Sequence, residues 1–298
     1  MRVFVTGATG FIGSLVVQDL INEGHHVLGL ARSDAGAQFL RDAGAQVHRG
    51  DLEDLESLRS GAALAEGVIH TAFNHDFSNY AANCEADRQA IEALGSALVG
   101  SDRPLIVTSG TLVAGAPGRP ATEEDAPVSS SAIARSASEE AALLLVSKGV
   151  RASVVRLPQV HDRLKFGLVS HLIATARQKG ISALVGDGLN RWPAVHRIDA
   201  ARLYVLALEK GSAGARYHAV AEEGVPLRDI AAAIGRGLKV PVVAQSPEEA
   251  AAHFGWFALF VGRDAPASSV LTQERLGWSP TAQPGMIDDL DHARDFEA

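Results

Sequence analysis

The chain opens with the run Arg2-Val3-Phe4-Val5-Thr6, followed at once by Gly7-Ala8-Thr9-Gly10-Phe11-Ile12-Gly13. An apolar strand that breaks at glycines and reopens as a helix is how a βαβ unit holds the pyrophosphate of a dinucleotide. Gly7 permits the tight turn, Gly10 lets the backbone approach the phosphates, and Gly13 lets the helix pack closely on the strand. We therefore predict a nucleotide cofactor at this turn. The expected contacts are Gly7, Thr9, Gly10, Phe11, Ile12 and Gly13.

Apolar stretches alternate with helical stretches through the first half of the chain. This alternation predicts an α/β fold, a doubly wound parallel sheet with helices on both faces. We expect strands at residues 2–6, 26–31, 45–48, 68–72, 104–109 and 152–158, and helices at residues 13–23, 37–41, 80–99 and 132–148. Beyond residue 161 the pattern is less regular, with a helix at 199–210 capped by Asp199 and a return to the sheet at 215–220.

The composition limits the class of protein. With 298 residues, 47% of them hydrophobic, the chain buries a large core without a disulfide framework. The single cysteine, Cys84, argues against a cysteine-based zinc site and fits a reducing cytoplasm, and we expect it to be buried in a helix. A net charge of −8 gives no footprint for nucleic acid, and we expect no membrane span or signal peptide. We expect a cytoplasmic protein whose partner is a small-molecule substrate.

The end of the second predicted strand bears on the choice of cofactor. An NAD-specific domain places an acid there to bind the ribose 2′-hydroxyl, whereas this chain has Ala31, followed by Arg32 and Ser33. A guanidinium can grip a 2′-phosphate with paired N–H donors, which an acid would repel. The alternative is that Arg32 is an ordinary exposed side chain, and Asp34 weakens the argument. We predict NADP, with NAD possible.

The spacing GxxGxxG within TGATGFIGS, residues 6–14, resembles the short-chain dehydrogenase/reductase superfamily, in its extended epimerase/dehydratase-like branch. The resemblance implies a seven-strand Rossmann core and a smaller C-terminal substrate-binding part. We place the NADP-binding domain at residues 1–160 and the substrate-binding part at 161–298, with about 196–222 returning to the sheet. Asp51 and Leu52 match the family's turn beside the adenine, although Asp51 also suits a cap for a helix at 52–58. Thr71 and Ala72 match the strand end that passes beside the nicotinamide ribose.

The resemblance also implies catalysis by a Ser or Thr, a Tyr and a Lys, the last two spaced YxxxK. Ser109 and Thr111, after the strand at 104–109, are the candidate hydroxyls, and the register between them stays open. The Tyr and Lys are missing. Counting back from Glu139 puts Arg135 at the Lys position and Ser131 at the Tyr position. Arg135 can hold the ribose or a phosphate but cannot act as a tunable base.

Other residues near the carboxyl ends of the strands are substitute acids or substrate contacts. His75, Asp76 and Tyr80 follow the strand at 68–72, and His161, Asp162 and Lys165 are expected in a loop after Pro158, itself a candidate cofactor contact. For each one alone, an ordinary role in loop structure is an open alternative. Arg191 and Trp192 lie in a segment that the family often places against the substrate, although Trp192 and His196 suit a purely structural role as well. The aromatic residues at 254–260 are typical of core or a dimer face.

Two classes of function remain. The first is an NADP(H)-dependent oxidoreductase or epimerase/dehydratase-like enzyme acting on a small carbonyl or alcohol, with its proton donor drawn from Tyr80, a loop histidine such as His75, or water. The second is a non-catalytic NADP(H)-binding redox sensor or partner-binding protein that has lost the Tyr. The resemblance implies a possible homodimer through the helices at 80–99 and 132–148.

Overall fold

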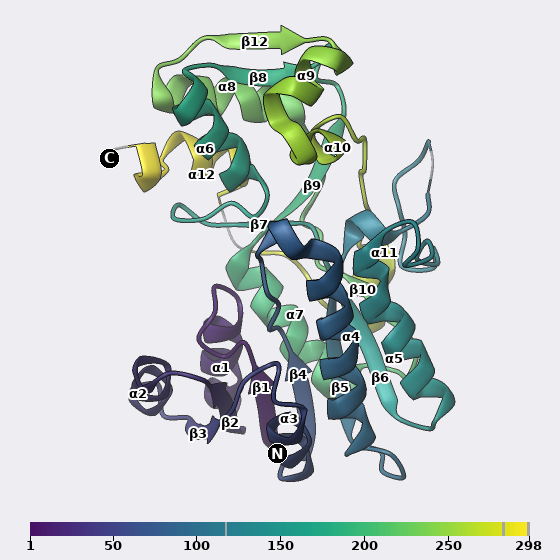
Figure 1. Ribbon diagram of the computed structural model, residues 1–298. Coiled ribbons are helices and arrows are strands. Elements are labelled where there is room, and N and C mark those ends of the chain that lie inside the picture. Colours follow the sequence, from purple (N-terminus) through teal and green to yellow (C-terminus); the bar gives the residue numbers. More distant parts are fainter. Residues whose placement is uncertain (117, 282–283, 297–298) are drawn as a thin grey trace.

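A seven-stranded parallel sheet forms the larger part of the molecule. The computed structural model describes residues 1–116, 118–281 and 284–296 (Figure 1). The strand order is β10-β6-β5-β4-β1-β2-β3, and each neighbouring pair is parallel. This sheet confirms the predicted Rossmann-like fold class. Its strands are β1 (Arg2–Thr6), β2 (His26–Ala31), β3 (Gln46–Arg49), β4 (Gly67–His70), β5 (Pro104–Gly110), β6 (Arg151–Leu157) and β10 (Arg216–His218).

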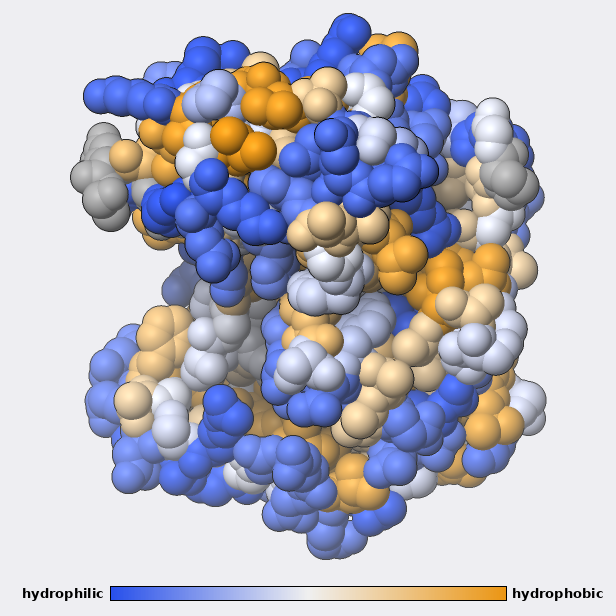
Figure 2. Space-filling view, turned by 45° about the horizontal axis from the view of Figure 1, so that its top comes forward, coloured by the Kyte–Doolittle hydropathy of each residue, from blue (hydrophilic) through white to orange (hydrophobic). Residues whose placement is uncertain are grey.

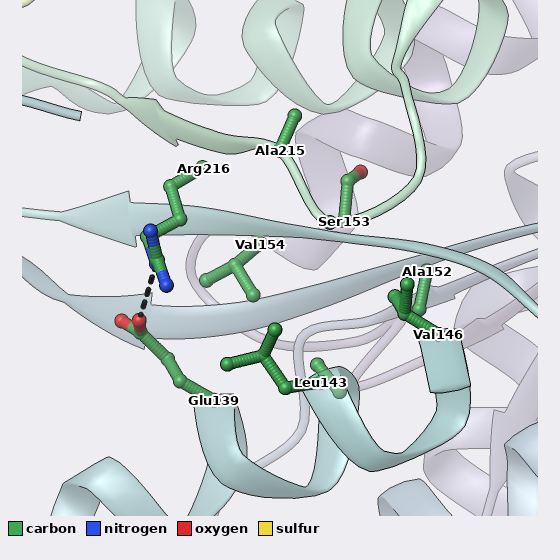
Figure 3. Close-up of a pocket in the computed structure, with 10 residues that line it drawn as sticks. Glu139, Leu143, Val146, Ala152, Ser153, Val154, Ala215 and Arg216 are labelled. Atoms are coloured by element: carbon green, nitrogen blue, oxygen red, sulfur yellow. Dashed lines mark ion pairs between the residues drawn. The ribbon is translucent and has the colours of Figure 1, made fainter. Parts of the chain in front are cut away.

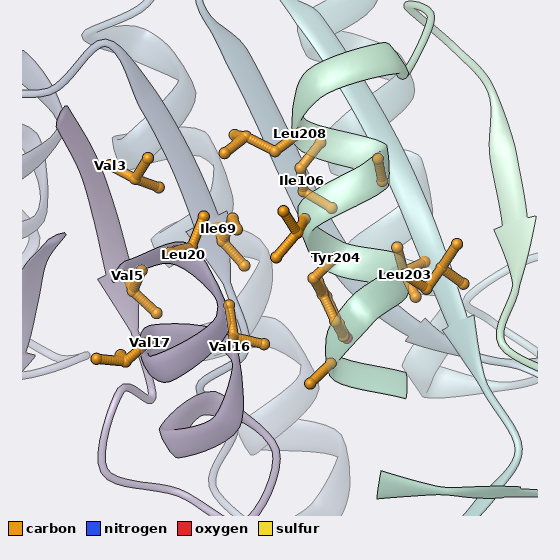
Figure 4. Close-up of a cluster of buried hydrophobic side chains, with 14 of the residues drawn as sticks. Val3, Val5, Val16, Val17, Leu20, Ile69, Ile106, Leu203, Tyr204 and Leu208 are labelled. Carbon is orange, nitrogen blue, oxygen red and sulfur yellow. The ribbon is translucent and has the colours of Figure 1, made fainter. Parts of the chain in front are cut away.

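Helices cover both faces of this sheet. One face is covered by α1 (Gly13–Asn22), α2 (Asp34–Asp42) and α7 (Arg197–Lys210), and the other by α3 (Leu55–Ala63), α4 (Tyr80–Ser96) and α5 (Ala137–Ser147). The strands read as near-continuous apolar runs because both of their faces are buried. Figure 4 shows the first of these cores, where Val5, Val16, Ile69, Ile106 and Tyr204 meet between β1, β4, β5, α1 and α7.

The second part lies over the carboxyl ends of the strands (Figure 1). It contains a three-stranded sheet of β11 (Glu222–Pro226), β9 (Arg191–His196) and β7 (Gln159–His161), and a parallel pair of β8 (Ser182–Val185) and β12 (Val242–Gln245). Its helices are α6 (Val169–Lys179), α8 (Leu227–Leu238), α9 (Pro247–Phe254), α10 (Ala258–Val261) and α12 (Met286–Asp291), whereas α11 (Val270–Leu276) contacts β10 and α7. Short 3-10 turns are η1 (Phe77–Asn79), η2 (Thr111–Val113), η3 (Ala134–Ser136), η4 (Gly255–Phe257) and η5 (Arg294–Phe296).

The start of α7 differs from the prediction. The helix begins at Arg197, and His196 caps it, because its Nδ1 accepts the N–H of Ile198 at 3.3 Å. Asp199 is buried in the first turn, where its carboxylate accepts the N–H of Thr281 at 3.0 Å. The prediction that Asp199 is the cap was therefore wrong, since a distant segment uses that carboxylate. Within the described residues, we find no helix long and apolar enough to cross a membrane.

Candidate functional site

Three glycines shape the turn after β1. Gly7 has φ +68°, and a Cβ placed on it would lie 2.7 Å from the backbone nitrogen of Ala72. A Cβ on Gly13 would lie 2.1 Å from the carbonyl oxygen of Gly7. The N–H of Gly10 donates to that same carbonyl at 2.8 Å. Positions 7 and 13 therefore need glycine, because any side chain would force α1 and the end of β4 away from the turn.

The start of α1 faces this turn. Among the described residues, no side chain caps α1, and its first turn carries no acid. Thr9 is exposed there, and Phe11 and Ile12 are half-buried. An uncapped helix start of this kind presents backbone N–H groups and a partial positive charge to a phosphate. The residues present therefore fit the pyrophosphate of a dinucleotide.

Two arginines lie at the adjoining ends of β2 and β3. Arg32 is exposed directly after the buried Ala31, and Ser33 caps α2 with its hydroxyl. Arg49, which the sequence analysis did not single out, donates to the carbonyl of Arg32 at 3.2 Å and pairs with the exposed Asp34 at 3.1 Å. The corner where an acid would bind the ribose 2′-hydroxyl thus carries two guanidinium groups.

The turn after β3 corrects one prediction. Asp51 does not cap the following helix: its carboxylate accepts the N–H of Glu53 at 3.1 Å, which makes a local turn. The cap is Asp54, which accepts the N–H of Ser57 at 3.1 Å, and α3 begins after it. Leu52 packs against the core on the α3 side of the sheet.

The two candidate hydroxyls at the end of β5 are both buried. Ser109 is 3% exposed, and its hydroxyl has no hydrogen-bond partner among the described residues. Thr111 is 4% exposed and begins η2. Thr108 uses its own hydroxyl inside the fold, donating to the carbonyl of His70 at 2.6 Å and contacting the Tyr204 hydroxyl at 2.7 Å. A buried hydroxyl without a protein partner, as at Ser109, is rare in folded proteins.

Arg135 lies beside the end of β5, held by several groups at once. One terminal nitrogen of its guanidinium donates to the Asp87 carboxylate at 2.7 Å and to the Ser138 hydroxyl, and the other donates to the carbonyl of Thr108 at 2.9 Å. The Phe73 ring faces the guanidinium, with its centroid 4.4 Å from the central carbon. The sequence predicted Arg135 on a helix at 132–148, whereas the structure has it in η3, before α5, with its side chain beside the end of β5. Asp87 was not predicted.

Asp87 joins Arg135 to the glycine turn. Its other carboxylate oxygen accepts from Nε2 of His70 at 3.0 Å, and Nδ1 of His70 lies 2.7 Å from the hydroxyl of Thr6, the last residue of β1. Burial by itself raises the pKa of Asp87, but the Arg135 charge and the hydrogen bond from His70 outweigh it and bring the pKa to about 2. We refer to Thr6, His70, Asp87, Arg135 and Ser138 as the Asp87 network.

The loop after β4 carries three candidates. His75 is exposed, and its Nδ1–H donates to the carbonyl of Phe73 at 3.1 Å. Asp76 caps η1 by accepting from the N–H of Ser78 at 3.0 Å and from its hydroxyl at 2.6 Å. Tyr80 begins α4, and burial is the largest of the causes that raise its pKa to about 12. Asp76 is thus engaged in the loop, while His75 keeps one ring nitrogen for other contacts.

Aromatic rings connect this loop with the second part of the molecule. The Phe77 ring stacks on Tyr80 at 5.5 Å between centroids and on Trp256 at 5.1 Å. The ring of His171, on α6, meets Phe77 edge-on at 5.3 Å. We call residues 73–80 the aromatic loop. Of the predicted late aromatic cluster, Phe254 and Phe257 are buried, whereas Trp256 is 49% exposed.

Two cations lie over the glycine turn, Arg197 at the start of α7 and Lys165 in the segment after β7. The guanidinium of Arg197 is 4.9 Å from the centre of the Phe11 ring, and Nζ of Lys165 is 5.8 Å from it. Arg197 also pairs with Asp162 at 3.2 Å. The structure thus brings Lys165 to the glycine turn, and its positive charge also contributes to lowering the pKa of His75.

His161 is not where the sequence predicted it. It is the last residue of β7, which begins directly after the half-buried Pro158, and so it does not lie in a loop. Its side chain is 1% exposed. Its Nδ1 lies 2.8 Å from the Asp289 carboxylate, and its Nε2 lies 3.8 Å from that of Glu222. The expectation of an accessible side chain at His161 was wrong, because the strand pairs with β9 and α12 covers it.

An open cavity of about 320 Å³ lies between α1 and the second part. Figure 2 shows the molecule deeply hollowed between its upper and lower parts. Arg163, Arg197 and Arg294 line this cavity, opposed by Asp162 and Asp289. The remaining lining residues are Leu15, Leu164, His196, Ile198 and Pro284.

Arg191 and Trp192 take structural positions on β9. Arg191 forms a two-pronged ion pair with Asp264, at 2.9 and 3.1 Å. Trp192 is 1% exposed and donates its indole N–H to the carbonyl of Arg263 at 3.2 Å. Of the two alternatives for Trp192, the structure favours the locking role.

Glu139 and Ser131, the two positions counted together with Arg135, form contacts within the protein. Glu139 is 1% exposed and receives both prongs of the buried Arg156, at 2.7 and 2.8 Å. Ser131 is exposed and lies 2.9 Å from the hydroxyl of Ser129. Glu139 also pairs with Arg216 at 3.3 Å beside a void of about 10 Å³ between α5, β6 and β10 (Figure 3). That void is far too small for a substrate.

Comparison with known proteins finds relatives that match nearly the whole chain. A protein from Schizosaccharomyces pombe described as uncharacterized is 52% identical over 97% of this chain and 98% of its own. A ketoreductase from Stigmatella aurantiaca, which acts on a farnesylated dihydroquinoline oxide, is 28% identical over 90% of this chain and 84% of its own.

A solved structure gives the same fold. A dTDP-glucose 4,6-dehydratase from Streptomyces venezuelae, crystallised with NAD, matches with a TM-score of 0.77 at 20% identity, covering 99% of this chain and 96% of its own. The model of the NAD dependent epimerase/dehydratase family matches residues 3–221, which include the glycine turn, the Asp87 network and β10. This chain therefore belongs to the NAD dependent epimerase/dehydratase family.

Proposed function

We propose that this protein is an NADP(H)-dependent oxidoreductase that transfers hydride between its cofactor and a small carbonyl or alcohol compound. The observation that carries the proposal is the glycine turn after β1, which leaves no room for a Cβ at Gly7 or Gly13 and which the Asp87 network joins to Arg135. A bound nicotinamide supplies hydride chemistry, and Arg135 supplies a fixed positive charge at the end of β5.

The preference for NADP rests on the corner between β2 and β3. Ala31 offers no carboxylate to a ribose 2′-hydroxyl, and both Arg32 and Arg49 lie at this corner. Two guanidinium groups favour a 2′-phosphate, because each presents a planar fork of N–H donors. Asp34 pairs with Arg49 and offsets one of these charges, so the corner keeps a net positive charge, with Arg32 as the guanidinium that Asp34 does not engage.

Individual residues of the chain are assigned to binding, charge stabilisation and proton transfer. Arg135 uses three of its five N–H donors on Asp87, Ser138 and Thr108, which leaves two donors for a ribose hydroxyl or a substrate oxygen. A positive charge fixed there stabilises the negative charge that develops on a carbonyl oxygen. In the neutral ring, Nδ1 of His75 carries the hydrogen bonded to Phe73, so Nε2 takes up and delivers the proton. Tyr80 is the alternative donor.

The aromatic loop and Trp256 favour a small substrate with an apolar part. Phe77 and Trp256 enclose the approach from the second part, while Lys165 adds one cation above the glycine turn. Aromatic walls with a few polar groups are typical of sites for small molecules. A ketoreductase among the relatives supports carbonyl reduction.

The test is consumption of NADPH against aldehydes, ketones, imines and keto-sugars, with NADH in parallel. We expect turnover with NADPH, and Arg32→Glu should weaken NADPH binding by about 10- to 100-fold while leaving NADH binding nearly unchanged. Arg41→Glu, the same charge reversal on α2, is the matched control. Turnover with NADH alone would contradict the assignment of NADP. Tight NADPH binding without turnover would favour the redox-sensor alternative.

We also propose that two copies pair through α4 and α5. Leu143 and Leu144 on α5 are 45% and 44% exposed, which is unusual for neighbouring leucines on one helix. Leu144→Glu should convert a dimer to a monomer in sedimentation, and Leu164→Glu, on an exposed loop of the second part, should not. A monomeric parent protein would overturn the pairing.

A further inference from the structure

Asp87 is a buried carboxylate to which three elements bring donors. Its side chain is 2% exposed, and it accepts from Arg135 before α5 at 2.7 Å, from Ser138 on α5 at 2.5 Å, and from His70 on β4 at 3.0 Å. A carboxylate is costly to bury unless it is paired and its oxygens are bonded. Both oxygens of Asp87 are bonded, so the position is built for a negative charge.

We propose that Asp87 is the positioning residue that holds Arg135 in the place of the missing lysine, and that it couples this arginine to the glycine turn. This inference rests on the proposed function, because it assigns Arg135 to the cofactor and substrate. It adds to the site a residue from the interior of α4, which also contributes Tyr80 at its first position.

The shape of the guanidinium explains why an acid is needed. Arg135 lies with one edge on Asp87 and the Thr108 carbonyl and with Phe73 against its face, so both its position and its plane are fixed. A planar fork can be oriented in this way, whereas the ammonium group of a lysine cannot. Without Asp87, the guanidinium loses its charged partner and can rotate away from the face of the Phe73 ring.

The second half of the inference follows from His70. Its two ring nitrogens bridge Asp87 and the hydroxyl of Thr6, which directly precedes Gly7. The hydroxyl of Thr71 donates to the carbonyl of Thr6 at 2.8 Å, so β1 and β4 are joined at the same level. A change at Asp87 therefore displaces Arg135 and also relaxes the turn that would bind the pyrophosphate.

The experiment compares Asp87→Asn with Glu140→Gln. Glu140 also joins α4 to α5, through Arg88 at 2.7 Å, but lies outside the network. We expect Asp87→Asn to raise the Kd and KM for NADPH about tenfold, as for loss of one hydrogen bond to a charged group, and to lower kcat as well. Glu140→Gln should leave all three unchanged. A folded Asp87→Asn with parental Kd, KM and kcat would overturn the proposal.

A double-mutant cycle with Arg135→Met separates positioning from bulk stability. If Asp87 holds Arg135, the double variant should lose less NADPH binding than the product of the two single losses, and what it loses beyond Arg135→Met alone is the contribution through His70 and the glycine turn. Fully independent roles would multiply the two losses. If Asp87→Asn fails to fold, Ser138→Ala takes its place, because it removes one donor and keeps the charge. A rise of about threefold in the NADPH Kd is then expected, and no rise would overturn the proposal.

The failure of the proposed function gives a different result. In that case, the parent protein would turn over no carbonyl compound with NADPH, or would bind neither NADPH nor NADH. The interaction between Asp87 and Arg135 could still be measured in urea unfolding, as the coupling between Asp87→Asn and Arg135→Met in the free energy of unfolding. Additive losses of stability would contradict the proposal that Asp87 positions Arg135, regardless of which ligand the protein binds.

Discussion

The Asp87 network and the aromatic loop border the same site, but different forces fix them. The network is buried, and its members are joined by charged and neutral hydrogen bonds of 2.5–3.0 Å. The aromatic loop is half-exposed. Ring contacts at 5.1–5.5 Å join Phe77 to Tyr80 within the loop and to His171 and Trp256 outside it. Hydrogen bonds fix both distance and direction, whereas ring contacts tolerate sliding.

This difference indicates that the Asp87 network and the aromatic loop have different roles. The network lies at the carboxyl ends of β1 and β4 and beside β5, where α4, η3 and α5 pack on the same sheet, and it is suited to holding charge at a fixed point. The aromatic loop contacts Trp256 of the second part, so its position depends on how the two parts meet. We therefore expect substitutions in the network to alter stability and chemistry, and substitutions in the loop to alter substrate binding.

The largest effect is expected from Arg135→Met. This substitution keeps most of the side-chain volume but leaves the Asp87 carboxylate buried without its cation, and breaking a buried pair costs about 3–5 kcal/mol. The free energy of unfolding, measured by urea denaturation, should fall by this amount, and activity should be lost. Arg88→Met, which breaks a partly exposed pair with Glu140, is the control and should cost about 1 kcal/mol or less. Equal losses in the two variants would contradict the assignment of a special role to the network.

A smaller effect on stability is expected from Phe77→Ala. The substitution removes the stacks on Tyr80 and Trp256, which contribute roughly 0.5–1.5 kcal/mol per pair. The free energy of unfolding should change little more than this, whereas KM for the carbonyl substrate should rise and amide exchange at residues 73–80 should accelerate. Phe39→Ala, on the exposed side of α2, should leave KM unchanged. A change in kcat without any change in KM would contradict the assignment of substrate binding to the aromatic loop.

The sequence was sufficient for the sheet and the glycine turn because both depend on local patterns. Burial on both faces gives the apolar strands, and the spacing of Gly7, Gly10 and Gly13 is a local pattern. The clash at Gly13 is with the nearby Gly7 carbonyl, whereas the one at Gly7 is with Ala72, which the fold brings to the turn. The end of β2 could also be located, since the strand ends where the apolar run gives way to Arg32.

The network could not be assembled from the sequence, because its members are far apart in the chain. Asp87 meets Arg135 across 48 residues and His70 across 17. One signal was available: Asp87 occupies the apolar stripe of α4 with Cys84, Ile91 and Leu94, where a charge needs a buried partner.

The failures at Asp51 and His161 have a different cause. Asp51 and Asp54 both suit a cap, and local backbone geometry decides between them. His161 follows a proline that is typical of a chain leaving a sheet, yet the chain continues directly into a strand of another sheet. Pairing with a distant strand overrides the local signal.

The smallest and most specific effect concerns His75 and pH. Although much of the His75 side chain is exposed, partial desolvation of its ring lowers its pKa below the usual 6.5. The positive charges of Arg135 and Lys165 also lower this pKa, whereas the bond to Phe73 acts in the opposite direction. The ring is therefore neutral at pH 7. If His75 delivers the proton, kcat/KM for carbonyl reduction should rise as pH falls below 6.5, and alcohol oxidation should show the reverse. Lys165→Met removes one of these charges and should move the midpoint of the profile upward, whereas His75→Gln should abolish the transition. The Tyr80 hydroxyl, with its pKa near 12, stays protonated throughout this range. A parent profile that is flat between pH 5 and 8 would therefore assign proton transfer to Tyr80 or water and would leave His75 as a structural member of the loop.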